Sequence, residues 1–227
     1  MITEIVSSSE LFNYPIWSLQ YLVSQKQTKL QSLYPIIALK DLVKERKEIV
    51  TPRNYPEKLF NYIGLENIES NVRVLANVNP KMGQQIKSSA KVYKRGDILY
   101  GRLRPSLNKV YLVTQDSFEG ICSTEIFVLT PNEEIINSEY LAEVLISEIV
   151  KKKAIALVRG ASLPRIQIDD FLRIKIPVPP RKEQETFANF ILEQRDKWLE
   201  YRIRVQEIPN YIKEELVNKV MGNRLLD

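Results

Sequence analysis

Residues 174–184 read Ile174-Lys175-Ile176-Pro177-Val178-Pro179-Pro180-Arg181-Lys182-Glu183-Gln184, and the character of the chain changes within this stretch. The prolines favour an extended segment at the edge of a sheet, because proline has no N–H group to give to a central strand. Beyond Pro180 the apolar residues recur at alternating spacings of four and three, which is the heptad pattern of a helix that pairs with another helix. The sequence therefore predicts a globular part up to residue 180 and a long helix after it.

The apolar seam of this helix predicts its pairing surface. Its members are Phe187, Ile191, Gln194, Trp198, Tyr201, Val205, Ile208 and Ile212. A single helix over 183–208 would be about 39 Å long at about 1.5 Å per residue, which is more than a globular part of this size easily covers. Packing on its own domain is the ordinary explanation of such a seam, but this length favours a partner helix. Pro209 predicts a kink, or the start of a second helix just after Ile208.

The part of the chain before residue 180 indicates a mixture of strands and helices. One helix is expected over about 16–33 and another over about 139–153, with Ser138 as the N-cap of the second. Short strands are expected at 60–65, 92–93, 98–100, 110–113 and 125–129, and 94–97 reads as a hairpin-like turn between two of them. The fold class expected is α+β, with an N-terminal helical extension over 1–34, a domain over 35–180 and the long helix over 181–227.

The composition excludes several kinds of chemistry. The 227 residues are 44% hydrophobic and 27% charged, which is typical of a globular protein. Histidine is absent, so neither a Ser-His-Asp nor a Cys-His nucleophile system is possible, and no zinc site can use imidazole. Cys122 is the single cysteine, so there is no intramolecular disulfide and no Cys-x-x-Cys metal site. No metal or other cofactor is expected.

Motif searches give no catalytic site. Residues 96–103 have the glycine spacing of a phosphate-binding loop but lack its terminal Lys-Ser/Thr pair. We therefore expect a protein that is not an enzyme, although a nuclease that uses scattered carboxylates stays open as an alternative. The sequence shows no apolar run long enough to span a membrane and no secretory signal, so a cytoplasmic location is expected.

The charge is unevenly distributed along the chain. The net charge of +5 conceals a block over 81–109 with eight Lys or Arg against Asp97 alone, and a second over 151–165 with five Lys or Arg and no acid. Between them, 110–150 holds eight acids and no Lys or Arg. Both basic blocks also contain Gly, Pro and Ser, as do loops that approach phosphates, and this pattern favours nucleic-acid binding over scattered surface lysines.

The candidate DNA-contacting residues come from these two blocks. Arg102 and Arg104 are suited to a guanine edge or a phosphate, and Gln84 and Gln85 to an adenine edge. For any single Lys or Arg a phosphate contact is the more common role. The loop around Ser162 is read equally well as a phosphate clamp or as a structural turn. The full set of candidates is Lys81, Gln84, Gln85, Lys87, Arg102, Arg104, Lys109, Arg159, Ser162 and Arg165.

Five segments taken in order resemble the specificity subunit of type I restriction–modification systems. They are 62–68, 93–105, 120–125, 160–166 and 176–184, and the resemblance covers about 36–227. It implies a target recognition domain, with a mixed β-sheet or barrel-like core and helices, that reads double-stranded DNA. It also implies a coiled-coil helix that pairs with a counterpart and sets the distance between two such domains. Such a subunit has no catalysis of its own and recruits a modification (methyltransferase) subunit and a restriction subunit.

The chain departs from that family's complete pattern in one respect. A complete specificity subunit carries two recognition domains and two helices, whereas this chain has one of each. We therefore expect a half-subunit that forms a homodimer through the C-terminal helix, or one part of a split system. An independent DNA- or RNA-binding regulator and the specificity fragment of a fused methyltransferase-nuclease stay open as alternatives. The resemblance does not account for residues 1–34.

Overall fold

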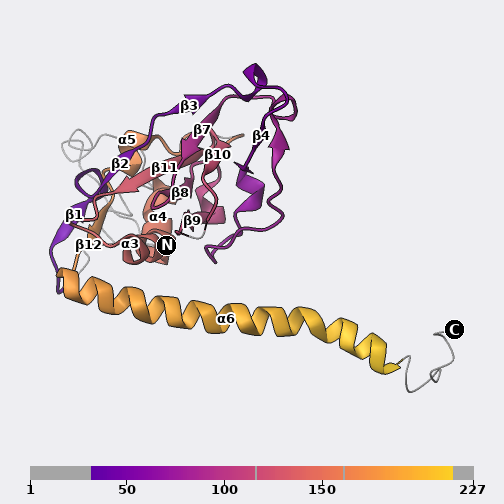
Figure 1. Cartoon of the computed structure of the whole chain (residues 1–227). Coiled ribbons are helices and arrows are strands. Elements are labelled where there is room, and N and C mark those ends of the chain that lie inside the picture. The colour runs from indigo at the N-terminus through magenta and orange to yellow at the C-terminus, as the bar shows by residue number, and fades with distance from the viewer. Residues whose placement is uncertain (1–31, 116, 161, 217–227) are drawn as a thin grey trace, which may run out of the picture. The chain divides into compact units, whose positions relative to one another are not determined.

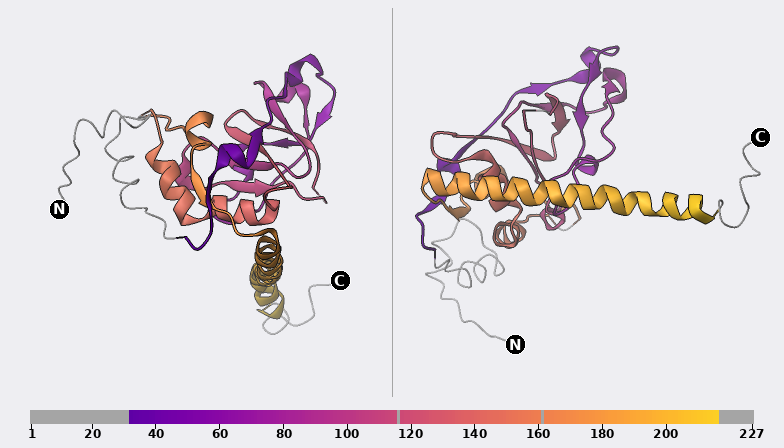
Figure 2. Two further views of the ribbon diagram at one scale, coloured as in Figure 1. Left: turned by 90° about the vertical axis from the view of Figure 1, so that its left-hand side faces the viewer. Right: turned by 60° about the horizontal axis from the view of Figure 1, so that its bottom comes forward.

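The computed structural model describes residues 32–115, 117–160 and 162–216 (Figures 1 and 2). The helix expected over 16–33 therefore lies almost wholly outside the described residues. The chain divides into two compact units, Met1–Glu185 and Thr186–Asp227. No described helix is both long enough and apolar enough to cross a bilayer.

The described part of the first unit is built from short strands, 3-10 helices and three α-helices. Up to the middle of the unit these are β1 (Ile36–Ala38), η1 (Leu39–Asp41), β2 (Val43–Glu45), β3 (Ile49–Val50), η2 (Pro52–Asn54), β4 (Leu59–Phe60), β5 (Tyr62–Ile63), η3 (Leu65–Asn67), β6 (Lys81–Met82), η4 (Gly83–Gln85) and β7 (Ala90–Tyr93). The remainder are β8 (Ile98–Gly101), η5 (Pro105–Leu107), β9 (Val110–Leu112), β10 (Gly120–Ser123), β11 (Ile126–Pro131), α3 (Ser138–Ile146), α4 (Glu148–Ala156), α5 (Ile168–Phe171) and β12 (Lys175–Pro177).

Two four-stranded sheets form the centre of this unit. One has the order β2-β11-β8-β9 and is antiparallel throughout. The other has the order β3-β7-β10-β5 and is mixed, because β10 pairs with β5 in parallel. Two-stranded ladders, β1-β12 and β4-β6, complete the set. The α+β class and the mixed sheet are thus confirmed, and the described strands form open sheets, with no closed barrel.

The core follows from the alternation of side chains along the central strands. In β8, Ile98 and Tyr100 pack into a cluster with the helices, whereas Leu99 points into a second cluster with Tyr93 and Cys122. Because strand side chains alternate between faces, such a strand is apolar at every position when both faces are covered. The helices α3 and α4 lie together beside the strands in Figure 2. Each large side chain buried here contributes about 1.5–3 kcal/mol.

The turn at Lys94–Asp97 does not close a hairpin, which corrects the expectation from sequence. β7 and β8 belong to different sheets, so the turn carries the chain from one sheet to the other. Gly96 has φ +85°, a left-handed conformation that glycine adopts without steric cost. The Asp97 carboxylate is fully buried and accepts hydrogen bonds from Lys94 N (2.8 Å), Thr130 Oγ1 (2.6 Å) and Arg46 Nε (2.7 Å). These contacts fasten the turn to β11.

The helix expected over 139–153 is two helices. Ser147 has an extended backbone (ψ 153°) that ends α3, and its carbonyl accepts from Lys151 N at the start of α4. The N-cap of α3 is Asn137 rather than Ser138, since the Asn137 side chain accepts from Tyr140 N at 3.0 Å. The strand expected over 60–65 is likewise divided between β4 and β5, which lie in different sheets.

The junction with the long helix agrees with the sequence pattern. β12 pairs with β1 and with no other described strand, so the proline-rich segment lies at a sheet edge as expected. It leads directly into α6 (Arg181–Leu216), 36 residues that include Pro209 (Figure 1). The residues on both sides of Pro209 are helical, and the kink expected there stays a prediction.

Candidate nucleic-acid interface

The fold brings parts of the two basic blocks together. Arg104 N donates to Pro164 O at 2.8 Å, Ile166 N donates to Arg102 O at 3.1 Å, and Leu103 and Arg165 form an isolated antiparallel bridge. A further bridge joins Arg159 to Arg165, and Ser162 lies in the loop between these two residues. We call the five candidates of these segments the arginine cluster: Arg102, Arg104, Arg159, Ser162 and Arg165. About 60 residues of sequence separate its two strands, so only the tertiary fold creates it.

Two of the arginines in the cluster are already paired with acids. Arg165 forks the Glu125 carboxylate, with Nε–Oε2 at 2.9 Å and Nη2–Oε1 at 2.8 Å. That hydrogen bonding holds the pKa of Glu125 below its ordinary value. Arg159 Nη2 lies 2.6 Å from the buried carboxylate of Asp170. Both guanidinium groups therefore hold separate segments of the fold together, Arg165 through Glu125 and Arg159 through Asp170.

Arg104 and Arg102 are more available. Arg104 is exposed, and its guanidinium forms no ion pair or hydrogen bond with the described residues. Its φ of 49° is a left-handed conformation that costs a non-glycine residue about 1 kcal/mol or more, and such strain is common at functional sites. Arg102 is half-buried over the Phe127 ring, with Cζ 5.4 Å from the ring centroid, and its Nη2 lies 3.4 Å from Gln167 Oε1. Ser162 is exposed.

The candidates over 81–87 occupy a different part of the first unit, on β6 and η4. Gln85 is already used by the fold, since its Oε1 accepts from Met82 N at 2.8 Å. Gln84 is exposed, and its amide contacts Met82 Sδ at 3.6 Å. Lys81 Nζ lies 4.7 Å from the Tyr62 ring centroid and 4.0 Å from Glu66. Lys87 is exposed and has no partner among the described residues.

Several lysines of the basic blocks already have partners within the fold. Lys109 is half-buried and donates from Nζ to Leu65 O at 2.8 Å. Lys153 is buried and donates from Nζ to Lys175 O at 2.9 Å, and burial lowers the pKa of its ammonium group. Lys151 pairs with Glu148 at 2.8 Å. The charge available to a ligand is consequently smaller than the sequence count of the two blocks suggests.

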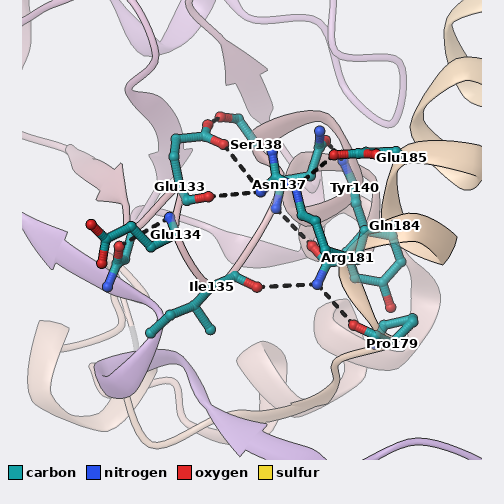
Figure 3. A network of polar contacts seen from close by, with 11 residues as sticks. Glu133, Glu134, Ile135, Asn137, Ser138, Tyr140, Pro179, Arg181, Gln184 and Glu185 are labelled. Carbon is teal, nitrogen blue, oxygen red and sulfur yellow. Dashed lines mark hydrogen bonds and ion pairs between the residues drawn. The ribbon is translucent and has the colours of Figure 1, made fainter.

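Sequence reasoning missed a hydrogen-bonded anchor at the start of α6, shown in Figure 3. Gln184 is 1% exposed; its Oε1 accepts from Asn137 N at 2.7 Å, and its Nε2 donates to Ile135 O (3.1 Å) and Pro179 O (2.9 Å). Arg181 Nη1 adds a bond of 2.7 Å to Glu133 O. We call these contacts the helix clamp.

The helix clamp gives the motif at 177–184 a structural role at the start of α6. The buried Gln184 side chain accepts one backbone hydrogen bond and donates two, and glutamate, which has the same shape, cannot donate when it is ionised. Asn137 takes part in two helix starts, because its own side chain caps α3 while its N–H binds Gln184. The available sequence signal was the position of Gln184, four residues after Pro180 and at the start of the expected helix.

The residues expected to pair with a second helix lie on α6, and most of them are exposed in the single chain. Exposed members of the seam are Phe187, Trp198, Tyr201, Val205, Ile208 and Ile212, and Ile191 is half-buried. The exposed fractions of Tyr201 and Val205 are 66% and 63%. Apart from Gln194 the seam is a row of apolar side chains, and such a row at this exposure is typical of an interaction surface. Phe190 and Ile203 are also exposed, outside the predicted seam.

The chain is similar to known proteins over most of its length. A family described as the type I restriction modification DNA specificity domain matches residues 34–206. The HindI type I restriction enzyme specificity subunit of Haemophilus influenzae is 28% identical over 63% of this chain and 30% of its own length. The EcoDI specificity subunit of Escherichia coli is 25% identical over 60% of this chain and 29% of its own.

Solved structures show the same fold. The HsdS subunit from Thermoanaerobacter tengcongensis matches with a TM-score of 0.64 at 24% identity, over 90% of this chain and 53% of that one. A chain from a structure of the complex assembly and conformational transition of the type I R-M system matches with a TM-score of 0.65 at 25% identity, over 86% and 51%. The matches thus span about a third of the curated relatives and about half of the solved ones.

Proposed function

The chain belongs to the family of type I restriction modification DNA specificity domains, and from this membership we propose that it reads one half of a double-stranded DNA target for a restriction–modification complex. The observation that carries the proposal is the extent of the family match, because residues 34–206 include both the sheet-rich unit and most of α6. In this proposal the chain has no catalysis of its own. It recruits a modification (methyltransferase) subunit and a restriction subunit, and acts on DNA in the cytoplasm.

The free arginine of the cluster is the proposed centre of DNA contact. Arg104 presents an exposed guanidinium, without a partner among the described residues, from a strained turn. Arg102 lies two residues earlier and is half-buried over the Phe127 ring. A guanidinium can fork a phosphate or the O6 and N7 atoms of guanine. Arg165, held by Glu125, positions this turn through the bridge to Leu103. DNA binding is then expected to weaken steeply with salt, because neutralised phosphates release counterions.

Two chains are proposed to pair through the exposed seam of α6. Pairing buries the row that runs from Phe187 to Ile212, and an antiparallel pair has two-fold symmetry. A two-fold dimer reads two inverted half-sites separated by bases that it does not contact. Each of the two paired recognition domains would in this way read one half of the target.

The test is to select binding sites from random duplex DNA with the purified full chain, and then to titrate the selected site at several salt concentrations. We expect a two-fold symmetric site and a steep salt dependence. Arg104→Ala is expected to weaken binding or relax the preference at one position, whereas Lys40→Gln, an exposed cation of η1, serves as the matched control. No selected site, or a salt slope near zero for the unaltered chain, contradicts the proposed function.

Assembly is tested separately by light scattering of the full chain. Ile191→Asp combined with Trp198→Asp is expected to convert a dimer into a monomer, because carboxylates in an apolar seam are costly to bury. Circular dichroism provides the control that α6 is still helical. A monomer at tens of micromolar for the unaltered chain, with its helix intact, would contradict self-pairing. Co-purification with a modification subunit tests recruitment.

A further inference from the structure

Two segments far apart in the sequence form one small lobe of the first unit. β4 and β6 pair in the register Leu59↔Met82 and Phe60↔Lys81. Beyond the strands, Gly83 N donates to Lys58 O at 2.9 Å and Gln84 N donates to Pro56 O at 3.1 Å. We call residues 52–60 together with 81–87 the lobe. Its first strand, β4, is labelled in Figure 1.

The lobe is a rigid platform. At Gly83 a Cβ atom would lie 2.1 Å from Tyr55 O and 2.4 Å from Pro52 O, so η2 and η4 are in direct backbone contact that only glycine permits. Gln85 Oε1 binds Met82 N within the same turn. Below these turns, Phe60 and Ile86 are buried in one apolar cluster with β7 and β10. These contacts fix the backbone that carries the exposed side chains of the lobe.

The lobe displays cations, an aromatic ring and an amide. Its exposed members include Arg53, Tyr55, Lys58, Gln84 and Lys87. Lys58 Nζ lies 5.7 Å from the Tyr55 ring centroid and 5.2 Å from that of Phe60, which restrains the ammonium group. Over 52–60 and 81–87 the sequence has four cations, with Lys81 the fourth, and one acid, Glu57. The Tyr55 side chain is 53% exposed.

We propose that the lobe is a second DNA-contacting element, in which Arg53 and Lys58 bind phosphates and Gln84 reads an adenine edge. The inference rests on the proposed function and extends it to a segment, 52–60, that charge counting leaves out. Cations and a tyrosine hydroxyl are the usual partners of the DNA backbone, and a glutamine amide can bond adenine N6 and N7 together. An acidic protein surface would explain the cations but not the displayed amide.

The two neighbouring glutamines have different roles in this proposal. The side-chain oxygen of Gln85 accepts a hydrogen bond from Met82 N, so in this proposal Gln85 holds the turn. Gln84 has only the long contact of its amide to Met82 Sδ, and both of its amide atoms can reach a ligand. Gln84→Ala should therefore change recognition while leaving the fold intact, and Gln85→Ala should do the reverse.

The first experiment measures the salt dependence of binding to the site selected with the unaltered chain. In a dimer bound to both half-sites the double variant Arg53→Gln, Lys58→Gln removes four phosphate contacts, two in each chain. We therefore expect the fall of log affinity with log salt to become less steep by about four, roughly one for each lost contact. The matched control is Lys40→Gln with Lys44→Gln, which removes two exposed cations outside the lobe. An unchanged slope in the first variant, or an equal fall in the control, overturns the proposal.

The second experiment repeats the site selection with the two glutamine variants. For Gln84→Ala we expect the preference for adenine to disappear at one position of each half-site, with the other positions and the melting temperature unchanged. For Gln85→Ala the selected bases should stay the same while the melting temperature falls. If Gln84→Ala selects the same site as the unaltered chain, the reading role of the lobe is refuted but the proposed function is not. If the unaltered chain selects no site, both fail.

Discussion

Replacing Gln184 with alanine is predicted to destabilise the first unit by an amount that can be worked out from its contacts. The side chain is 1% exposed and makes three hydrogen bonds, to Asn137 N, Ile135 O and Pro179 O. Each such bond contributes about 1 kcal/mol net, and more where truncation leaves a buried backbone group without a partner. The expected loss is therefore roughly 3 kcal/mol of unfolding free energy.

The assay is urea unfolding at fixed chain concentration, followed by circular dichroism, with thermal melting alongside. For a chain of this size roughly 3 kcal/mol corresponds to a fall in melting temperature of about 6–12 °C. Gln206→Ala is the matched control, because Gln206 is an exposed residue of the same helix and alanine raises helix propensity at both positions. We expect the control to differ from the unaltered chain by less than about 0.5 kcal/mol.

A second substitution at the same residue separates hydrogen bonding from packing. In Gln184→Glu the side chain keeps its shape and can still accept from Asn137 N, but a carboxylate cannot donate to Ile135 O and Pro179 O. We expect this variant to be at least as unstable as Gln184→Ala at pH 7 and to recover part of the loss in acid, when protonation restores one donor. If Gln184→Ala melts within 1 °C of Gln206→Ala, the helix clamp does not stabilise the junction and the reasoning is wrong.

Three further predictions concern buried or paired side chains. The Cys122 thiol is fully buried and its pKa is raised to about 12, so it should not react with a disulfide reagent at pH 8 until the chain is unfolded, when one equivalent reacts; rapid reaction of the folded chain would contradict this burial. Arg165 lowers the pKa of Glu125 in the folded chain, so the ionised carboxylate stabilises the folded state at pH values above the pKa of Glu125 in the unfolded chain. This stabilisation is lost as the pH falls through the lower pKa of the folded chain. Glu125→Gln should therefore cost about 1 kcal/mol at pH 7 and less at pH 3, measured by urea unfolding. Asp97→Ala should cost about 3 kcal/mol or more, because it leaves the Arg46 guanidinium and a backbone N–H without their acceptor; a melting temperature equal to that of the unaltered chain would show that the Asp97 contacts do not hold the turn.

Local patterns were sufficient for some strands of the two central sheets. Continuous apolar runs at 98–100 and 126–129 correspond to β8 and β11, which are buried on both faces. The same patterns failed at 94–97 and at 147, where the predicted hairpin and the predicted single helix were wrong. A four-residue turn has the same sequence pattern whether the next strand joins the same sheet or another one. The sequence pattern also gave no sign of the extended backbone at Ser147, where α3 ends.

The candidate site was predictable by segment and not by residue. The sequence indicated two basic blocks, and the fold does join their ends through Arg104 and Pro164. It did not distinguish Arg104, which is free of partners among the described residues, from Arg165, which Glu125 holds. The same is true of Gln84 and Gln85. From the sequence alone, two side chains of the same type have the same chemistry, and only their neighbours in space distinguish them.

By itself, the sequence determined the α+β class, the edge strand before Pro180, the long helix with its apolar seam and the likeness to type I specificity subunits. These features depend on residues that lie within a few positions of one another, so periodicity and proline placement reveal them. Only the tertiary structure decided which charges are spent on the fold, that Gln184 anchors the start of α6, and that 52–60 lies against 81–87. Those outcomes depend on partners that are distant along the chain, 40 residues from Arg165 to Glu125 and 47 from Gln184 to Asn137. Such a contact leaves no local periodic pattern, because it forms only when the intervening strands pack.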